Sequence, residues 1–256
     1  MAPTTRIAQH HEHHHEHARL LKKLAESNLH ATRAFAGLPS PPASPKSIAR
    51  KDSHSIDPHS QANLDVWTTQ HTHLALIIDF DRRVIVGKVE HTMMLLQPPT
   101  HPLPDIILDT NGLDILAITV NGKNVNFHLE EPHEAFGSAL IIEMVSVLPS
   151  PTIKVQITYQ TATESAALSW VEPHQTLGKT LPYLYTQCHA IQTRALLPCQ
   201  DSPSVRMTYS AAIQAPLAFN VAMSAEFIKK EVHDTTCTFH FEQPIALPVL
   251  HFLLVW

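Results

Sequence analysis

The stretch His73-Leu74-Ala75-Leu76-Ile77-Ile78-Asp79-Phe80 carries the period that decides the fold. Side chains of a β-strand point alternately to its two faces, so every second residue from Leu74 to Phe80 shares one face. That face is apolar throughout, whereas the other face includes His73 and Asp79. The pattern predicts a strand that is half-buried against a core.

Two later stretches repeat this alternation, and turn residues separate the strands. The tripeptide Asp81-Arg82-Arg83 follows the first strand, and Asn121-Gly122-Lys123 lies between candidate strands at 118–120 and 125–127. Asn-Gly supplies the positive φ angles that a tight hairpin needs. The repeated apolar positions are Ile153, Val155, Ile157 and Tyr159 in one stretch, and Val205, Met207, Tyr209, Ala211 and Ile213 in the other.

The fold class predicted from these strands is mainly β. Strands recur about every ten residues without a helical pattern of more than three turns between them, which is typical of an antiparallel sandwich or a related large-sheet fold. The predicted domain covers residues 62–247. Residues 1–61 hold a His-rich tract, a short helix at 18–36 and a disordered linker rich in Pro and Ser, and residues 248–256 form an atypical apolar end.

Composition limits the classes of partner. The chain has 256 residues, 44% of them hydrophobic, which is enough for a core. The net charge is −5, but residues 1–60 carry eight Lys or Arg against five Asp or Glu, so the rest of the chain is acidic. We therefore expect no nucleic-acid partner. No apolar run is long enough to span a bilayer, so we expect no membrane anchor.

The three cysteines, Cys188, Cys199 and Cys237, are odd in number and lack CxxC spacing. In a chain without a signal-type leader they predict buried thiols in a reduced compartment. We expect a cytoplasmic location. Basic residues between Arg6 and Arg33 leave a mitochondrial presequence open.

The most specific segment is PYLYTQCHAIQTRALLPCQDSPSVRMTY, residues 182–209. Together with HLALIIDFDRRVIVGKVEHTMMLL (73–96), LDTNGLDILAITVNG (108–122) and LSWVEPHQTLGKTLPYLYTQC (168–188), it resembles the N-terminal domain of leukotriene A(4) hydrolase and the related zinc aminopeptidases. The resemblance covers residues 57–246 and implies a saddle-like, largely β domain. In that family a zinc-binding catalytic domain with GxMEN and HExxH-x18-E motifs follows.

This chain contains no GxMEN, and its one HExxH string, His11 to His15, lies before the β-domain in a tract with histidine at 10, 11, 13, 14, 15 and 17. An HExxH helix places two imidazoles one turn apart with the Glu as general base, but a histidine tract produces this spacing by composition alone. The position of the family's third ligand is Ala34. We predict no catalytic residue and no metal ligand here, and no cofactor bound by this chain; zinc belongs to the full-length family. Adventitious Zn or Ni binding by the tract and a solvated segment both stay open.

The resemblance assigns substrate-binding positions to the loop Gln187-Cys188-His189-Ala190, which in the family forms part of the peptide channel. Gln187 and Ala190 match the family, whereas His189 replaces a Gln that hydrogen-bonds the free amine of the peptide. A neutral imidazole accepts one hydrogen bond and a protonated one repels an ammonium group, so amine recognition would depend on pH. The alternative is that His189 only packs in its loop.

Neighbouring residues favour a scaffold. Pro198 and Pro203 restrict the following loop, and Asp201 is placed to pair with Arg194 or to cap backbone N–H groups. Tyr183 and Tyr185 could line a channel, but packing in the strand core is the favoured interpretation.

The predicted function is that of a shortened relative whose N-terminal domain contributes to a peptide channel and is inactive alone, so peptide is a partner only with a catalytic domain. A natural short form and an incomplete gene model both stay open. One alternative is a non-enzymatic module that binds a protein partner through the face left by the missing domain. The other is metal binding by the histidine tract.

Overall fold

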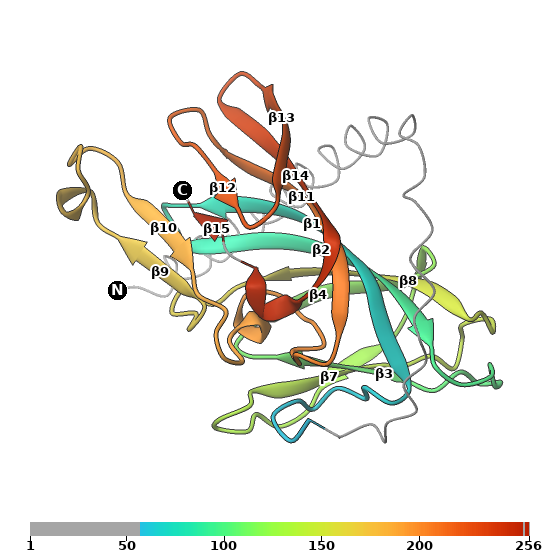
Figure 1. The fold of residues 1–256 in the computed structure, drawn as a ribbon. Coiled ribbons are helices and arrows are strands. Elements are labelled where there is room, and N and C mark those ends of the chain that lie inside the picture. Colours follow the sequence, from blue (N-terminus) through green and yellow to red (C-terminus); the bar gives the residue numbers. More distant parts are fainter. Residues whose placement is uncertain (1–56, 253, 256) are drawn as a thin grey trace, which may run out of the picture. The chain divides into compact units, whose positions relative to one another are not determined.

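The structure is a computed structural model that describes residues 57–252 and 254–255. The predicted helix at 18–36, most of the linker and the histidine tract lie outside these residues. The described fold is mainly β, as predicted, with three short 3-10 helices (η) and no α-helix among the described residues (Figure 1). None of the described helices has the length and hydropathy to cross a membrane.

The largest sheet has eight strands in the order β13-β14-β11-β1-β2-β8-β4-β5. Its long strands β1 and β2 form a hairpin through the predicted turn at residues 81–83, where Arg83 has a φ of 53°. The strand bounds are β1 Trp67–Asp79, β2 Val84–Leu95, β4 Asp114–Val120, β5 Lys123–Asn124, β8 Thr152–Gln160, β11 Arg206–Pro216, β13 Glu226–Val232 and β14 Thr236–Pro248.

This sheet is mixed, because β1 and β11 run parallel, with Leu74 opposite Ala211. Its other strand pairs are antiparallel. The expectation of an antiparallel arrangement is therefore correct for every pair of this sheet except β1 with β11. A parallel pair requires a long connection between its strands, and here the connection contains most of the domain.

Two small sheets accompany the large one. A three-stranded sheet has the order β3-β7-β6, and a four-stranded sheet has the order β12-β15-β10-β9, at the left of Figure 1. Their bounds are β3 Ile106–Thr110, β6 Phe127–Leu129, β7 Ser138–Ile142, β9 Leu168–Val171, β10 Tyr183–Thr186, β12 Ala222–Met223 and β15 Leu254–Val255. The 3-10 helices are η1 Pro173–Gln175, η2 Thr193–Ala195 and η3 Val249–His251.

The predicted hairpin at Asn121-Gly122 is confirmed, with φ angles of 48° and 79°, and β4 pairs with β5 across it. The strand expected at 125–127 is wrong. Strand β5 ends at Asn124, and β6 starts at Phe127 and pairs with β7 in the three-stranded sheet. The chain changes sheets at the point where the sequence suggests one continuous strand.

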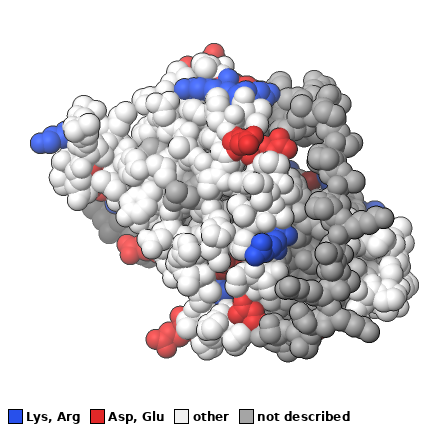
Figure 2. All heavy atoms as spheres, viewed as in Figure 1, with Lys and Arg blue, Asp and Glu red and all other residues white. Residues whose placement is uncertain are grey.

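The core includes the faces that the alternation predicts, but the first stretch is not half-buried, because Ala75 and Ile77 on its other face are buried as well. Each repeated apolar residue of the second and third stretches is buried, and so are Leu74, Leu76 and Ile78, while Phe80 packs partly buried at the edge of the core. The cysteines are free and buried, as expected. Figure 2 shows the charged side chains of one face as separate groups among uncharged residues.

Residues 57–61 contact the domain, although the sequence places them in the linker. Ser60 Oγ and the backbone N–H of Gln61 donate hydrogen bonds to Asp109 at 2.6 and 2.7 Å. Ser202 Oγ donates to Asp57 at 2.6 Å. Asp57, Ser60 and Gln61 therefore make side-chain or backbone contacts with the domain.

Candidate ligand pocket

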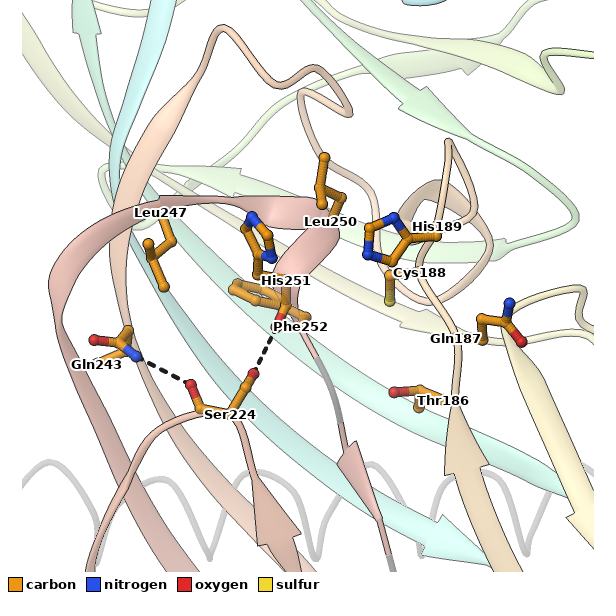
Figure 3. Close-up of a pocket in the computed structure, with 10 residues that line it drawn as sticks. All are labelled: Thr186, Gln187, Cys188, His189, Ser224, Gln243, Leu247, Leu250, His251 and Phe252. Carbon is orange, nitrogen blue, oxygen red and sulfur yellow. Dashed lines mark hydrogen bonds between the residues drawn. The ribbon is translucent and has the colours of Figure 1, made fainter.

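A pocket of about 540 Å³ opens beside the loop that follows β10. One wall is the run Thr186–His189, which includes two of the three predicted substrate-binding residues (Figure 3). The opposite wall comes from the end of β14 and from η3 at the C-terminal end, with Ser224 and Gln243 beside it. A cavity of this size can hold a small ligand or the end of a peptide.

The two walls each contribute one imidazole. The rings of His189 and His251 lie 6.2 Å apart between centroids, nearly perpendicular at 85°. Both side chains are exposed, and both point into the space between the walls (Figure 3). The pocket lining contains no Asp, Glu, Lys or Arg side chain.

Ser224 holds the second wall in place. Its hydroxyl donates a hydrogen bond of 2.6 Å to the carbonyl oxygen of His251, and its own carbonyl oxygen accepts one of 3.1 Å from the Gln243 amide (Figure 3). The Tyr209 hydroxyl, reaching up from β11, also bonds to Ser224. Phe252 packs on the Tyr209 ring with centroids 4.2 Å apart, so the turn that carries His251 is tied to the large sheet.

The C-terminal end is part of the fold. Val249 and Phe252 are buried in the core, and β15 lies between β10 and β12, with Val255 opposite both Tyr185 and Ala222. Hydrogen bonding and burial thus fix residues 249–252 and 254–255 beside the pocket. The apolar composition of this end gives no sign in the sequence that His251 lines a pocket.

A buried ion cluster anchors the first wall. Arg194 on η2 pairs with Asp201 through Nε at 3.0 Å and lies 3.5 Å from Asp109. All three side chains are almost completely inaccessible, and the prediction that Arg194 pairs with Asp201 is confirmed. Burial raises the pKa of Asp109 and of Asp201, and Arg194 partly offsets this effect. The cluster makes the loop a rigid scaffold, as expected.

The thiols of this region are poor nucleophiles. Burial raises the pKa of Cys188 to about 12, and the pKa of Cys199 is also raised well above its usual range by burial. No three His, Cys, Asp or Glu side chains of residues 57–252 and 254–255 come together in a way that could hold a metal ion. The residues that the structure describes therefore do not fit a catalytic zinc ion.

The predicted site residues divide as follows. Gln187 and His189 line the pocket, whereas Ala190 is exposed in the turn next to it and is not part of the lining. The interpretation of Tyr183 and Tyr185 as core residues is wrong, because each is 37% exposed on the outer face of β10. Neither tyrosine lines the pocket. These tyrosines alternate with buried Leu184 and Thr186, so one face of the strand is exposed to solvent.

Comparison with known proteins gives consistent matches. Residues 68–249 match the family described as "Peptidase M1 N-terminal domain". Leucine aminopeptidase 2 of Phaeosphaeria nodorum is 34% identical over 198 residues, which are 75% of this chain and 31% of that protein. Leukotriene A-4 hydrolase of Xenopus laevis is 34% identical over 75% of this chain and 32% of its own length. The chain thus spans about a third of the curated relatives it matches.

Solved structures agree in fold. Native leukotriene A4 hydrolase from Saccharomyces cerevisiae superposes with a TM-score of 0.72 at 28% identity, over 81% of this chain and 31% of that one. An M1 zinc metallopeptidase from Deinococcus radiodurans gives a TM-score of 0.60 at 21% identity, over 74% of this chain and 42% of that one, and shows the fold alone.

Proposed function

The chain belongs to the family of M1 peptidase N-terminal domains, and from this premise we propose that its pocket forms one wall of a peptide-binding channel. In this proposal the domain binds and orients the amino end of a peptide. The groups that cleave the peptide bond come from a catalytic domain that the described residues do not include.

The observation that carries the proposal is the position of Gln187 and His189 at an open pocket on a rigid support. The backbone N–H of Gln187 donates to the carbonyl oxygen of Ala167, and the carbonyl oxygen of Cys188 accepts from Gln192, so the loop is tied at both ends. An amide and an imidazole on such a loop can hydrogen-bond a peptide end without first ordering themselves. Binding sites need this preorganisation.

Catalysis by the described residues alone has little support. The buried Cys188 thiol stays protonated at neutral pH, because burial raises its pKa to about 12. The relatives act as whole proteins about three times as long as the matched region. We therefore propose that this chain alone does not hydrolyse peptides, and that the zinc named for one relative is held outside this domain.

Peptide titration of the full chain tests the proposal. Leu-Ala-Ala amide should shift the backbone amide resonances of residues 186–189 and 250–252 in nitrogen-15 spectra. The His189→Ala variant should bind about tenfold more weakly, as expected for one lost hydrogen bond to a charged group. The matched control His128→Ala changes another exposed histidine, on β6, and should leave binding unchanged.

A negative result has a clear form. Peptide-induced shifts that lie outside residues 186–189 and 250–252, or the absence of shifts, would contradict the proposal that the pocket binds a peptide. Release of the amino-terminal residue by the purified chain, abolished by a chelator, would contradict the half that denies activity.

Exposed apolar side chains favour a second candidate, a module that binds another protein. Phe227 and Ile228 on β13, an edge strand of the large sheet, and Ile245 on β14 are 56%, 46% and 66% exposed. An edge strand with apolar side chains is a template for association. Co-sedimentation with a full-length relative should be lost in a Phe227→Asp variant, and equal co-sedimentation of both forms would exclude this surface.

A further inference from the structure

The lining of the pocket has no carboxylate and no Lys or Arg. Its titratable side chains are the groups to consider for a ligand. These are His189, His251 and Cys188, with the Tyr209 hydroxyl below Ser224. Burial raises the pKa of Cys188 to about 12 and also raises the pKa of Tyr209, so both groups are neutral between pH 5 and 8.

The two imidazoles are the hydrogen-bonding rings that face this space. An imidazole N–H donates a hydrogen bond whether the ring is neutral or protonated. His189 and His251 are both exposed. With ring centroids 6.2 Å apart on opposite walls, the two rings face a common space from two sides.

A carboxylate matches this arrangement better than any other common group. It has two oxygens, each of which can accept a charge-assisted hydrogen bond from one ring. The neighbouring amides of Gln187 and Gln243 can donate further hydrogen bonds, and Leu247, Leu250 and Phe252 supply an apolar surface for a short aliphatic stem.

We propose that His189 and His251 together bind the carboxylate of an acidic side chain at the amino end of a peptide. The inference rests on the proposed function, because it places a peptide in the same pocket. It adds the class of peptide, and it assigns a role to His251, which only the tertiary structure brings to the site.

Two amidated tripeptides that differ in one group provide the test. Glu-Ala-Ala amide has a single carboxylate, and Gln-Ala-Ala amide has the same shape without it. Each is titrated into the nitrogen-15-labelled full chain, and dissociation constants come from the amide shifts of residues 186–189 and 250–252. These local signals separate the pocket from the histidine tract at residues 10–17.

At pH 5.5 the Glu peptide should bind at least about tenfold more tightly than the Gln peptide, as expected for a charged hydrogen bond gained. His251→Leu replaces the imidazole by an aliphatic side chain, and His189→Gln keeps a hydrogen-bonding group. Each should lower the preference at pH 5.5, and the double variant should abolish it.

Two results would overturn the inference: equal affinities at pH 5.5, or a preference that survives in the double variant. If both peptides bind equally in the pocket, this inference fails and the proposed function stands. If neither peptide shifts the pocket resonances, both fail. Spectra of each variant that overlay on the wild type away from the pocket show that folding is intact.

Discussion

Replacement of Arg194 by Met should destabilise the domain strongly. The guanidinium is fully buried and forms ion pairs with Asp201 at 3.0 Å and Asp109 at 3.5 Å. It also donates hydrogen bonds to the carbonyl oxygens of Phe136 at 3.0 Å and His59 at 2.8 Å. Methionine fills much of the same volume but leaves two buried carboxylates without a counter-charge.

Removal of one partner of a buried ion pair costs about 3–5 kcal/mol, because the remaining charge stays buried and uncompensated. We expect a loss in the free energy of unfolding within that range, measured by urea denaturation of the full chain at pH 7. Arg206 is an exposed arginine on β11, and the matched control Arg206→Met should change stability by about 0.5 kcal/mol or less.

The loss should shrink in acid. Burial already raises the pKa of both carboxyls, and without Arg194 their pKa values rise further. A group whose pKa is higher in the folded than in the unfolded state binds its proton more tightly when folded, so acid stabilises the variant relative to the wild type. A loss below about 1 kcal/mol at pH 7, or one that is the same at pH 4.5 and pH 7, would refute this reasoning.

Three further predictions test other parts of the structure. Burial lowers the pKa of His91 to about 4, so the stability that the neutral ring contributes above its unfolded pKa of about 6.5 should be lost as pH falls towards 4. In a His91→Leu variant the free energy of unfolding should fall less steeply between pH 7 and 4. An identical pH profile in the variant and the wild type would contradict this. Gly137 has a φ of 70°, and an added Cβ would lie 2.1 Å from the carbonyl oxygen of Thr110. The free energy of unfolding, measured by urea denaturation, should therefore fall more in Gly137→Ala than in Gly122→Ala, where the space is free and the loss should be about 1 kcal/mol. Equal losses in the two variants would argue against the close contact. The buried thiols should react with a disulfide reagent at pH 8 only after unfolding in urea, and rapid modification of the folded chain would disprove their burial.

Local patterns in the sequence predict much of the fold. Alternation at residues 74–80, 153–159 and 205–213 identifies the buried faces, and Asn121-Gly122 identifies a hairpin. These features depend on neighbours within a few residues of each other, which a single sequence displays. The Arg194–Asp201 pair is also visible because the two residues are only seven positions apart.

Local sequence patterns indicate only one of the two walls of the candidate site. The resemblance points to Gln187 and His189, which lie on one short loop. His251 lies about sixty residues later, in a segment whose apolar composition indicates packing and nothing about a ligand. Ser224, in the bend between β12 and β13, and Gln243, on β14, fix the second wall, but both are ordinary polar residues and carry no local signal.

Short-range periodicity and contiguous motifs were enough to indicate the β class, the buried faces of the strands, the family and one wall of the pocket. The parallel pairing of β1 with β11, the place of Asp109 in the ion cluster and the approach of His251 to His189 are visible only in the folded structure. These contacts join residues 62 to 137 positions apart along the chain. Such partners meet only when folding brings distant segments together, and side-chain packing and hydrogen bonding then fix the pairing.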